Sequence, residues 1–206
     1  MSATFKQRKS DLLAQCAAAQ SPKRARQIHQ HLALLSRLCD DTLHDLWQQA
    51  QMPHEACLVA VGGYGRAALF PYSDVDVLVL LPTEAMLDRD EDLKSKVEHF
   101  IGSCWDAGLE IGSSVRNLSE CLAEAAHDIT VQTAMLESRL VVGSTVLYAQ
   151  FEQAFKAQME PRAFFTAKTL EMLQRHSKYE NTPYALEPNC KESPGCLLYT
   201  SDAADE

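Results

Sequence analysis

Two aspartates separated by a single residue are the strongest candidates for chemistry in this sequence. Asp74 and Asp76 stand at the start of an apolar run that ends at Leu81. Side chains alternate across a β-strand, so both carboxylates would share one face while Val75 and Val77 point into the core. Two like charges this close repel each other unless a cation lies between them. Mg²⁺ binds carboxylate oxygens together with substrate phosphates, which makes the pair a candidate site for metal-assisted phosphoryl transfer.

A glycine-rich segment precedes the two aspartates. An apolar stretch over residues 58–61 leads directly into Gly62 and Gly63. Glycines at the end of a strand allow backbone N–H groups to approach phosphates without a Cβ in the way. Arg66 could add a guanidinium for phosphate oxygens. An ordinary turn is the alternative, and the segment matches neither a dinucleotide fingerprint nor a P-loop.

The order of strand, Gly-Gly, ten residues and Asp-x-Asp resembles the nucleotidyltransferases of the DNA polymerase β superfamily. Within that superfamily, residues 62–76 are similar to the bifunctional uridylyltransferase/uridylyl-removing enzymes that act on the nitrogen regulator PII. Two later segments, residues 105–116 and 181–195, strengthen this resemblance. It runs from about residue 56 to residue 195.

The resemblance implies a Mg²⁺-dependent transfer of UMP from UTP to a tyrosine of PII, with release of pyrophosphate. It implies these site residues: Asp74 and Asp76 as Mg²⁺ ligands, Gly62 and Gly63 against the UTP phosphates, Arg66 and Ser73 as further nucleotide contacts, and Glu110 as a third catalytic and metal-binding carboxylate. An exposed acid at a strand edge is the alternative for Glu110.

Some positions and functions stay open at this point. Ser113 stands where the family has a histidine, and Arg116 could face the phosphates or pair with a neighbouring acid. His127 and Asp128 are expected to be a helix-end pair and not metal ligands. Two other functions remain possible: transfer of AMP or CMP by another member of the superfamily, or a non-catalytic nucleotide-sensing domain.

The elements that must position these residues follow from hydrophobic periodicity. Ser21 and Pro22 indicate a helix start, and apolar residues then recur at three- and four-residue steps from Ile28 to Trp47. The patterns predict helices over residues 6–19, 90–105, 129–140, 145–158 and 161–179, with a further helix beginning at Ser119, and strands over residues 57–61, 75–81 and 109–116.

These elements predict an α/β (α+β) fold, a small mixed-sheet nucleotidyltransferase domain with flanking helices. The expected boundaries are 1–52 for N-terminal helices, 53–143 for the nucleotidyltransferase core, 144–195 for the start of a truncated helical extension, and 196–206 for an artefactual tail. The tail resembles a translated sequencing adapter, so we expect the natural chain to continue beyond Gly195.

Composition limits the compartments and partners. The net charge of −9 argues against a nucleic-acid-binding surface, and the longest apolar run is too short for a membrane span of roughly 20 residues. No secretory signal is evident, so a cytoplasmic protein is expected. Seven cysteines without a Cys-x-x-Cys spacing indicate reduced, mostly buried thiols.

Overall fold

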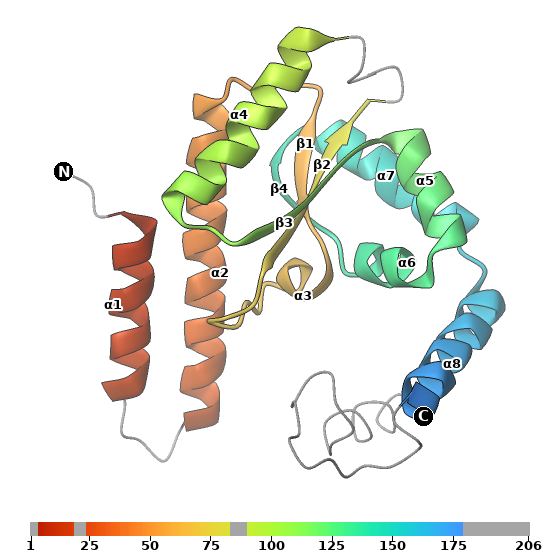
Figure 1. Ribbon diagram of the computed structural model, residues 1–206, viewed down its shortest axis with the longest axis horizontal. Helices are drawn as coiled ribbons and strands as arrows, with labels where there is room; N and C mark the ends of the chain where they lie inside the picture. The colour runs from red at the N-terminus through yellow and green to blue at the C-terminus, as the bar shows by residue number, and fades with distance from the viewer. Residues whose placement is uncertain (1–3, 19–23, 83–89, 179–206) are drawn as a thin grey trace. The chain divides into compact units, whose positions relative to one another are not determined.

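The computed structural model describes residues 4–18, 24–82 and 90–178. Residues 1–158 form one compact unit, which holds every strand within the described ranges, and a second unit begins at residue 159. The elements follow in the order α1 (Phe5–Ala18), α2 (Arg24–Gln49), β1 (Cys57–Ala60), α3 (Gly62–Gly65), β2 (Val75–Leu81), α4 (Glu91–Ala107), β3 (Ile111–Asn117), α5 (Leu118–His127), α6 (Ile129–Leu136), β4 (Arg139–Gly143), α7 (Thr145–Gln158) and α8 (Pro161–Lys178) (Figure 1).

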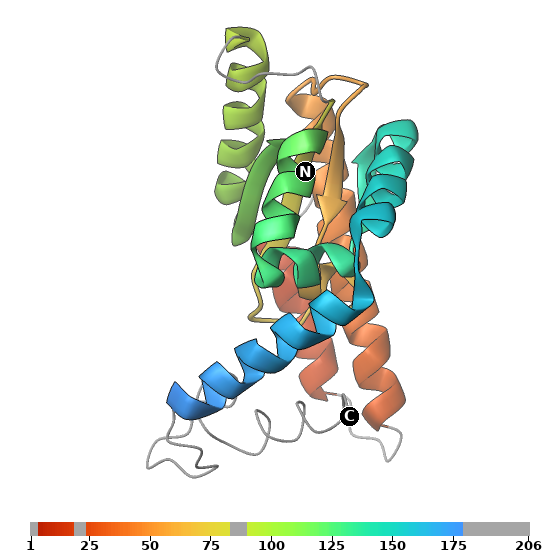
Figure 2. The same ribbon diagram turned by 90° about the vertical axis from the view of Figure 1, so that its right-hand side faces the viewer.

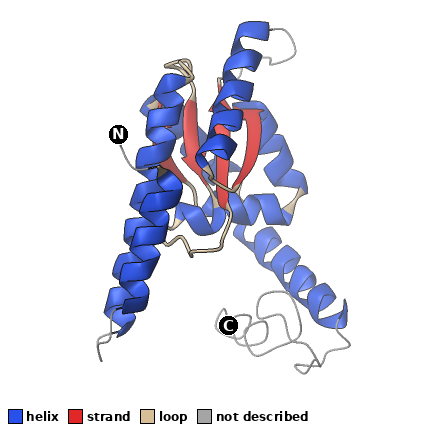
Figure 3. Cartoon of the chain, turned by 60° about the vertical axis from the view of Figure 1, so that its left-hand side comes forward, coloured by secondary structure: helices blue, strands red, loops and turns tan. Residues whose placement is uncertain are grey.

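The first unit is built around a mixed sheet with strand order β3-β2-β1-β4. Strand β1 is antiparallel to both β2 and β4, whereas β2 and β3 are parallel. Helices α1, α2 and α4 lie on one side of the sheet, and α5, α6 and α7 lie on the other (Figures 1 and 3). The mixed α/β fold expected from the sequence is therefore confirmed.

The central strands are buried on both faces, as is usual for a sheet covered by helices on each side. Alternate residues of β2, from Val75 to Leu81, pack against α2 and α4 in the main core. There the rings of Trp47 and Phe100 meet edge to face, with 5.3 Å between their centroids. The intervening residues Leu78 and Leu80 point to the other face and are equally buried.

Helices α5, α6 and α7 cover this second face of the sheet, and they lie in front of it in Figure 2. Their buried side chains are mostly apolar, among them Met135 on α6 and Phe151 on α7. Four free cysteines of the described chain are buried in the two cores, and burial raises the pKa of each thiol to about 12; they are Cys39, Cys57, Cys104 and Cys121. The expectation of reduced, buried thiols is confirmed for these four.

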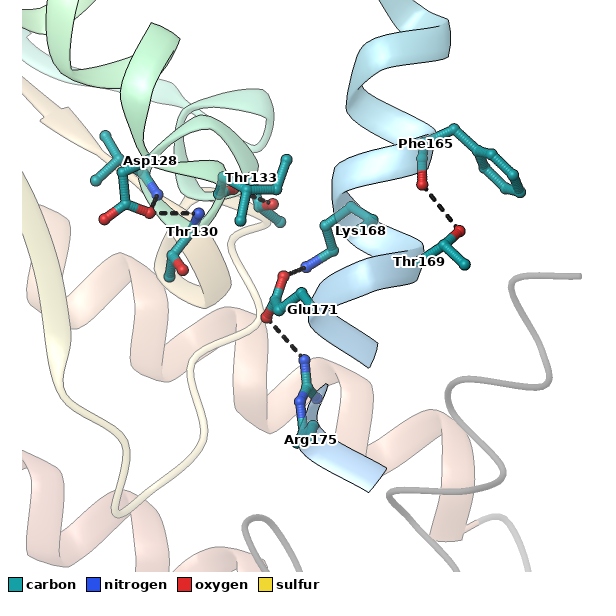
Figure 4. A network of polar contacts seen from close by, with 10 residues as sticks. Asp128, Thr130, Thr133, Phe165, Lys168, Thr169, Glu171 and Arg175 are labelled. Carbon is teal, nitrogen blue, oxygen red and sulfur yellow. Dashed lines mark hydrogen bonds and ion pairs between the residues drawn. The ribbon is translucent and has the colours of Figure 1, made fainter. Parts of the chain in front are cut away.

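A single aspartate separates α5 from α6. His127 is the last residue of α5, and the Asp128 carboxylate accepts hydrogen bonds from the backbone N–H groups of Thr130 and Val131, at 2.7 and 3.2 Å (Figure 4). These bonds cap the amino terminus of α6. The interpretation of His127 and Asp128 as a helix-end pair is confirmed.

One predicted element is wrong. The sequence pattern predicted a single helix over residues 129–140, but α6 ends at Leu136 and Arg139 begins strand β4. Arg139 is the register partner of Ala60 on β1, and its guanidinium binds the Asp40 carboxylate on α2. Partners distant in the sequence therefore decide the conformation of this segment. Ile28, the first residue of the predicted apolar repeat, is 46% exposed.

The other predicted elements are confirmed with small shifts at their ends. Two shifts reach two residues: β3 begins at Ile111, after its predicted start at residue 109, and α4 ends at Ala107, after its predicted end at residue 105. Gly62–Gly65 forms one helical turn that periodicity did not indicate. The predicted helix start at Ser21 and Pro22 lies outside the described residues.

The second unit contributes helix α8. Its Glu171 carboxylate pairs with Lys168 at 2.7 Å and with Arg175 at 2.9 Å, both on the same helix (Figure 4). These pairs one turn apart support the helix locally. Within the described ranges, no helix is long and apolar enough to span a membrane.

The cap of α6 predicts a pH-dependent stability. Hydrogen bonds from the Thr130 and Val131 amides lower the pKa of Asp128 below its ordinary value of 3.8. The carboxylate therefore stabilises the fold above that value, and this contribution is lost as the pH falls through the lower native pKa. We expect Asp128→Ala to reduce the free energy of unfolding by about 1 kcal/mol at pH 7.

Urea denaturation at a series of pH values measures this effect. The difference between wild type and Asp128→Ala should shrink below about pH 4. Asp128→Asn is the matched control, because an asparagine caps the helix at every pH. A deficit for the alanine variant that stays constant down to pH 2 would contradict the role assigned to the carboxylate.

Candidate functional site

Asp76 lies between two glycines from different parts of the chain. It is an exposed residue of β2, whereas its neighbours Val75 and Val77 are buried. A Cβ built on Gly62 would stand 3.8 Å from one Asp76 carboxylate oxygen, and a Cβ on Gly112 would stand 2.5 Å from the other. Gly112 is the register partner of Asp76 on β3. The carboxylate thus occupies space that a side chain at position 112 would fill.

Asp74 and Glu110 lie at the same end of the β2–β3 ladder. Each directly precedes a strand, and their next residues, Val75 and Ile111, are register partners. The Val75 amide donates to the Glu110 carbonyl oxygen at 2.8 Å, and both acids are exposed. Among the residues of the described ranges, no three His, Cys, Asp or Glu side chains form a group that could hold a metal ion. The metal-binding role of Glu110 stays a prediction.

The glycine segment forms a tight turn beside Asp76. The backbone conformation of Gly62 is left-handed, with φ +57°, which a glycine adopts without strain. The Val61 amide donates to the Asp76 carbonyl oxygen at 3.1 Å, and this hydrogen bond holds the residue before the turn against the backbone of β2. Gly63 is exposed. Backbone groups of this turn therefore lie next to the carboxylate that the sequence pattern paired with them.

Arg66 and Ser73 both lie in the loop that joins the turn to β2. The Arg66 guanidinium pairs with Glu137, and this hydrogen bond raises its pKa above the ordinary value. Its side chain is 57% exposed, and an exposed ion pair of this kind contributes little to stability. Ser73 is exposed, and its amide donates to the Phe70 carbonyl oxygen at 3.1 Å.

A pocket of about 380 Å³ extends from Asp76 across the sheet. Its floor includes Ser113, Ser114 and Arg116 of β3, and α6 supplies an apolar wall that includes Met135. Arg116 also approaches Glu124 on α5 at 3.8 Å, so it pairs with a neighbouring acid while lining the pocket. The pocket is thus lined by a carboxylate, by serine hydroxyl groups and by an apolar wall.

Sequence reasoning missed two glycines at this site. Gly112 leaves room for Asp76, and Gly65 packs against the chain after α6, where a Cβ would stand 1.5 Å from the Glu137 carbonyl oxygen. Neither belongs to the glycine pair that the motif singled out. The only signal in the sequence was their residue type, because the atoms that require a glycine lie far away along the chain.

Gly65 is therefore expected to be intolerant of any side chain. Gly65→Ala should lower the free energy of unfolding by about 2–4 kcal/mol, because the backbone of Glu137 has to move. The matched control is Gly63→Ala in the same turn, whose Cβ would meet only the end of the Arg66 side chain at 3.7 Å. Urea denaturation of both variants measures the contrast, and equal stabilities would contradict the described packing.

Two protein families match this chain. Residues 42–128 match the family described as nucleotidyltransferase domain, and residues 163–197 match the family described as GlnD PII-uridylyltransferase. The bifunctional uridylyltransferase/uridylyl-removing enzyme of Burkholderia mallei (strain ATCC 23344) is 51% identical over 195 residues, which is 95% of this chain and 22% of that protein. The protein of the same description from Burkholderia pseudomallei (strain K96243) gives the same identity and coverage.

A solved structure described as a toxin–antitoxin with AMP-PNP covers 69% of this chain and 96% of its own, with a TM-score of 0.36 and 12% identity. The chain spans about a fifth of the length of the curated relatives it matches. It is similar to part of the bifunctional uridylyltransferase/uridylyl-removing enzymes, and its residues 42–128 match the nucleotidyltransferase domain family.

Proposed function

We propose that this chain carries the site that transfers UMP from UTP to a tyrosine of the protein PII. One observation carries the proposal: the Asp76 carboxylate lies on a buried strand, between Gly62 and Gly112, at the edge of a 380 Å³ pocket. The relatives whose name includes uridylyltransferase share 51% of their aligned residues with this chain. UTP is the proposed donor, and PII is the proposed acceptor.

The donor set suits Mg²⁺. This ion is usually held by one or two carboxylates together with substrate phosphates, and dedicated all-protein cages are uncommon for it. Asp74 and Asp76 provide two exposed carboxylates separated by one residue. We assign them as the residues that would hold Mg²⁺, and we keep Glu110 as the candidate third carboxylate. When bound, the ion supplies positive charge that neutralises the triphosphate.

The chain's own residues bind and orient the donor. Backbone N–H groups of Gly62 and Gly63 contact the phosphates, and Arg66 can leave its exposed partner Glu137 to add a guanidinium. Ser73 is a further proposed contact. In the reaction, the tyrosine oxygen bonds to the α-phosphorus, the bond from that phosphorus to the β-phosphate oxygen breaks, pyrophosphate leaves and the tyrosine proton is released. Most of the rate enhancement would come from positioning and charge stabilisation.

The assignment predicts which carboxylates nucleotide binding requires. Asp76→Asn and Asp74→Asn should each weaken Mg²⁺–UTP binding at least about tenfold, since each removes a charge that the bound ion needs. Isothermal titration calorimetry of the 206-residue chain measures this. Asp92→Asn is the control, because Asp92 is exposed on α4 and pairs only with Lys96 in the described ion pairs.

Three outcomes would contradict the proposal. Full Mg²⁺–UTP affinity in Asp76→Asn would remove the assigned metal site. Tighter binding of ATP or CTP than of UTP would favour transfer of AMP or CMP. An absence of binding by a folded wild-type chain would contradict the function assigned to this site.

The close approach of Gly112 to Asp76 generates a separate prediction. In Gly112→Ala the new Cβ would stand 2.5 Å from a carboxylate oxygen at the end of the Asp76 side chain, so the carboxylate has to move. We expect Mg²⁺–UTP affinity to fall about tenfold, while the free energy of unfolding changes by less than about 1 kcal/mol.

Gly102→Ala is the matched control for this test. Nothing lies within 4 Å of the Cβ it would add on helix α4, so the helix should gain about 0.5–1 kcal/mol and binding should be unchanged. Calorimetric titration and urea denaturation are applied to both variants. Wild-type affinity in Gly112→Ala would show that the position of the Asp76 carboxylate does not matter for binding.

A further inference from the structure

A partly buried polar cluster adjoins the glycine turn. Tyr64, in the middle of α3, is 1% exposed, and its hydroxyl donates to the carboxylate of Asp40 on α2. The same carboxylate accepts two hydrogen bonds from the Arg139 guanidinium on β4, both at 3.0 Å. That guanidinium lies 5.3 Å from the centre of the Tyr64 ring. Three elements distant in the sequence therefore meet at one carboxylate.

The turn has two more contacts with the chain near Arg139. Gly65 packs against the carbonyl of Glu137, and Arg66 pairs with the Glu137 carboxylate. Three consecutive residues of the turn, 64–66, thus contact residues 137–139 at the junction between α6 and β4. Gly62 and Gly63 directly precede this tied segment, so their position depends on it.

The hydrogen bonds of this cluster fix the orientation of Tyr64 relative to α2 and β4. A partly exposed ion pair contributes little net stability, but the two parallel hydrogen bonds from the Arg139 guanidinium to Asp40 define the relative position of these side chains. Burial raises the pKa of the Tyr64 hydroxyl, which keeps it protonated as a donor. Burial lowers the pKa of Arg139, but its bonds to Asp40 outweigh this and raise the pKa overall. Both partners of Asp40 therefore stay hydrogen-bonded donors across the physiological pH range.

We propose that Asp40, Tyr64 and Arg139 are positioning residues that hold the amides of Gly62 and Gly63 opposite Asp76 for nucleotide binding. This inference rests on the proposed function. Asp40 and Arg139 both lie outside the 42–128 match to the nucleotidyltransferase domain. The phosphate-binding turn is thus set by residues that flank the domain on either side, and a chain trimmed to the match would lose two of the three.

Tyr64→Phe is the primary variant, because it removes one hydroxyl and keeps the buried ring. Arg139→Lys is the second, since it keeps the positive charge but loses the two parallel bonds to Asp40. Asp92→Asn again serves as the surface control. Each is made in the 206-residue chain and studied by amide hydrogen exchange and by calorimetric titration with Mg²⁺–UTP.

We expect exchange over residues 61–66 to become about tenfold faster in both variants, while exchange in β1 and β2 stays as in wild type. Mg²⁺–UTP affinity should fall about tenfold in the same variants. Faster amide exchange confined to residues 61–66, together with weaker Mg²⁺–UTP binding, would indicate a positioning role. General destabilisation would instead accelerate exchange across the whole sheet.

Three results would overturn the inference: unchanged exchange over residues 61–66, faster exchange spread evenly over the sheet, or faster local exchange with wild-type Mg²⁺–UTP affinity. A folded wild-type chain that binds no Mg²⁺–UTP would instead overturn the proposed function. The exchange measurement would then decide by itself whether the cluster holds the turn.

Discussion

The placement of one carboxylate on a strand that is buried on both faces is the constraint around which this structure is organised. Asp76 interrupts the apolar run of β2, so the sheet has to open to solvent at that point while α4 and α7 cover it elsewhere. Space for the carboxylate exists because two of its neighbours, Gly62 and Gly112, have no side chain. The pocket beside Asp76 lies between the sheet and α6, whose side chains form one of its walls.

The conformation of the glycine turn also needs support from the rest of the structure. A segment with three glycines has little side-chain packing of its own to define its conformation. Tyr64 lies within this segment. Its hydroxyl donates to Asp40 on α2, and its buried ring contacts Arg139 on β4. Gly62 lies beside the Asp76 carboxylate, whereas the Tyr64 side chain is buried in the core.

Much of the fold could be predicted from local pattern. Alternation along β2 correctly separated Asp76 from Val75 and Val77, and helix α7 matches its predicted bounds. The segment after Leu136 could not be predicted in this way, because β4 exists through its pairing with β1 and through the bonds of Arg139 to Asp40. For the same reason the motif singled out Gly62 and Asp76 as candidates, but it could not single out Gly112, Asp40 or Arg139, whose contacts are with other segments of the chain.

The central claim is that Asp74, Asp76 and the Gly62–Gly63 turn form one site for a metal-bound nucleoside triphosphate. A crystal structure of the 206-residue chain with Mg²⁺ and a non-hydrolysable UTP analogue tests it most directly. The account predicts a metal ion bound by carboxylate oxygens of Asp74 and Asp76, with phosphate oxygens against the amides of Gly62 and Gly63. A nucleotide bound away from the turn, or a metal ion that Asp76 does not ligate, would contradict it.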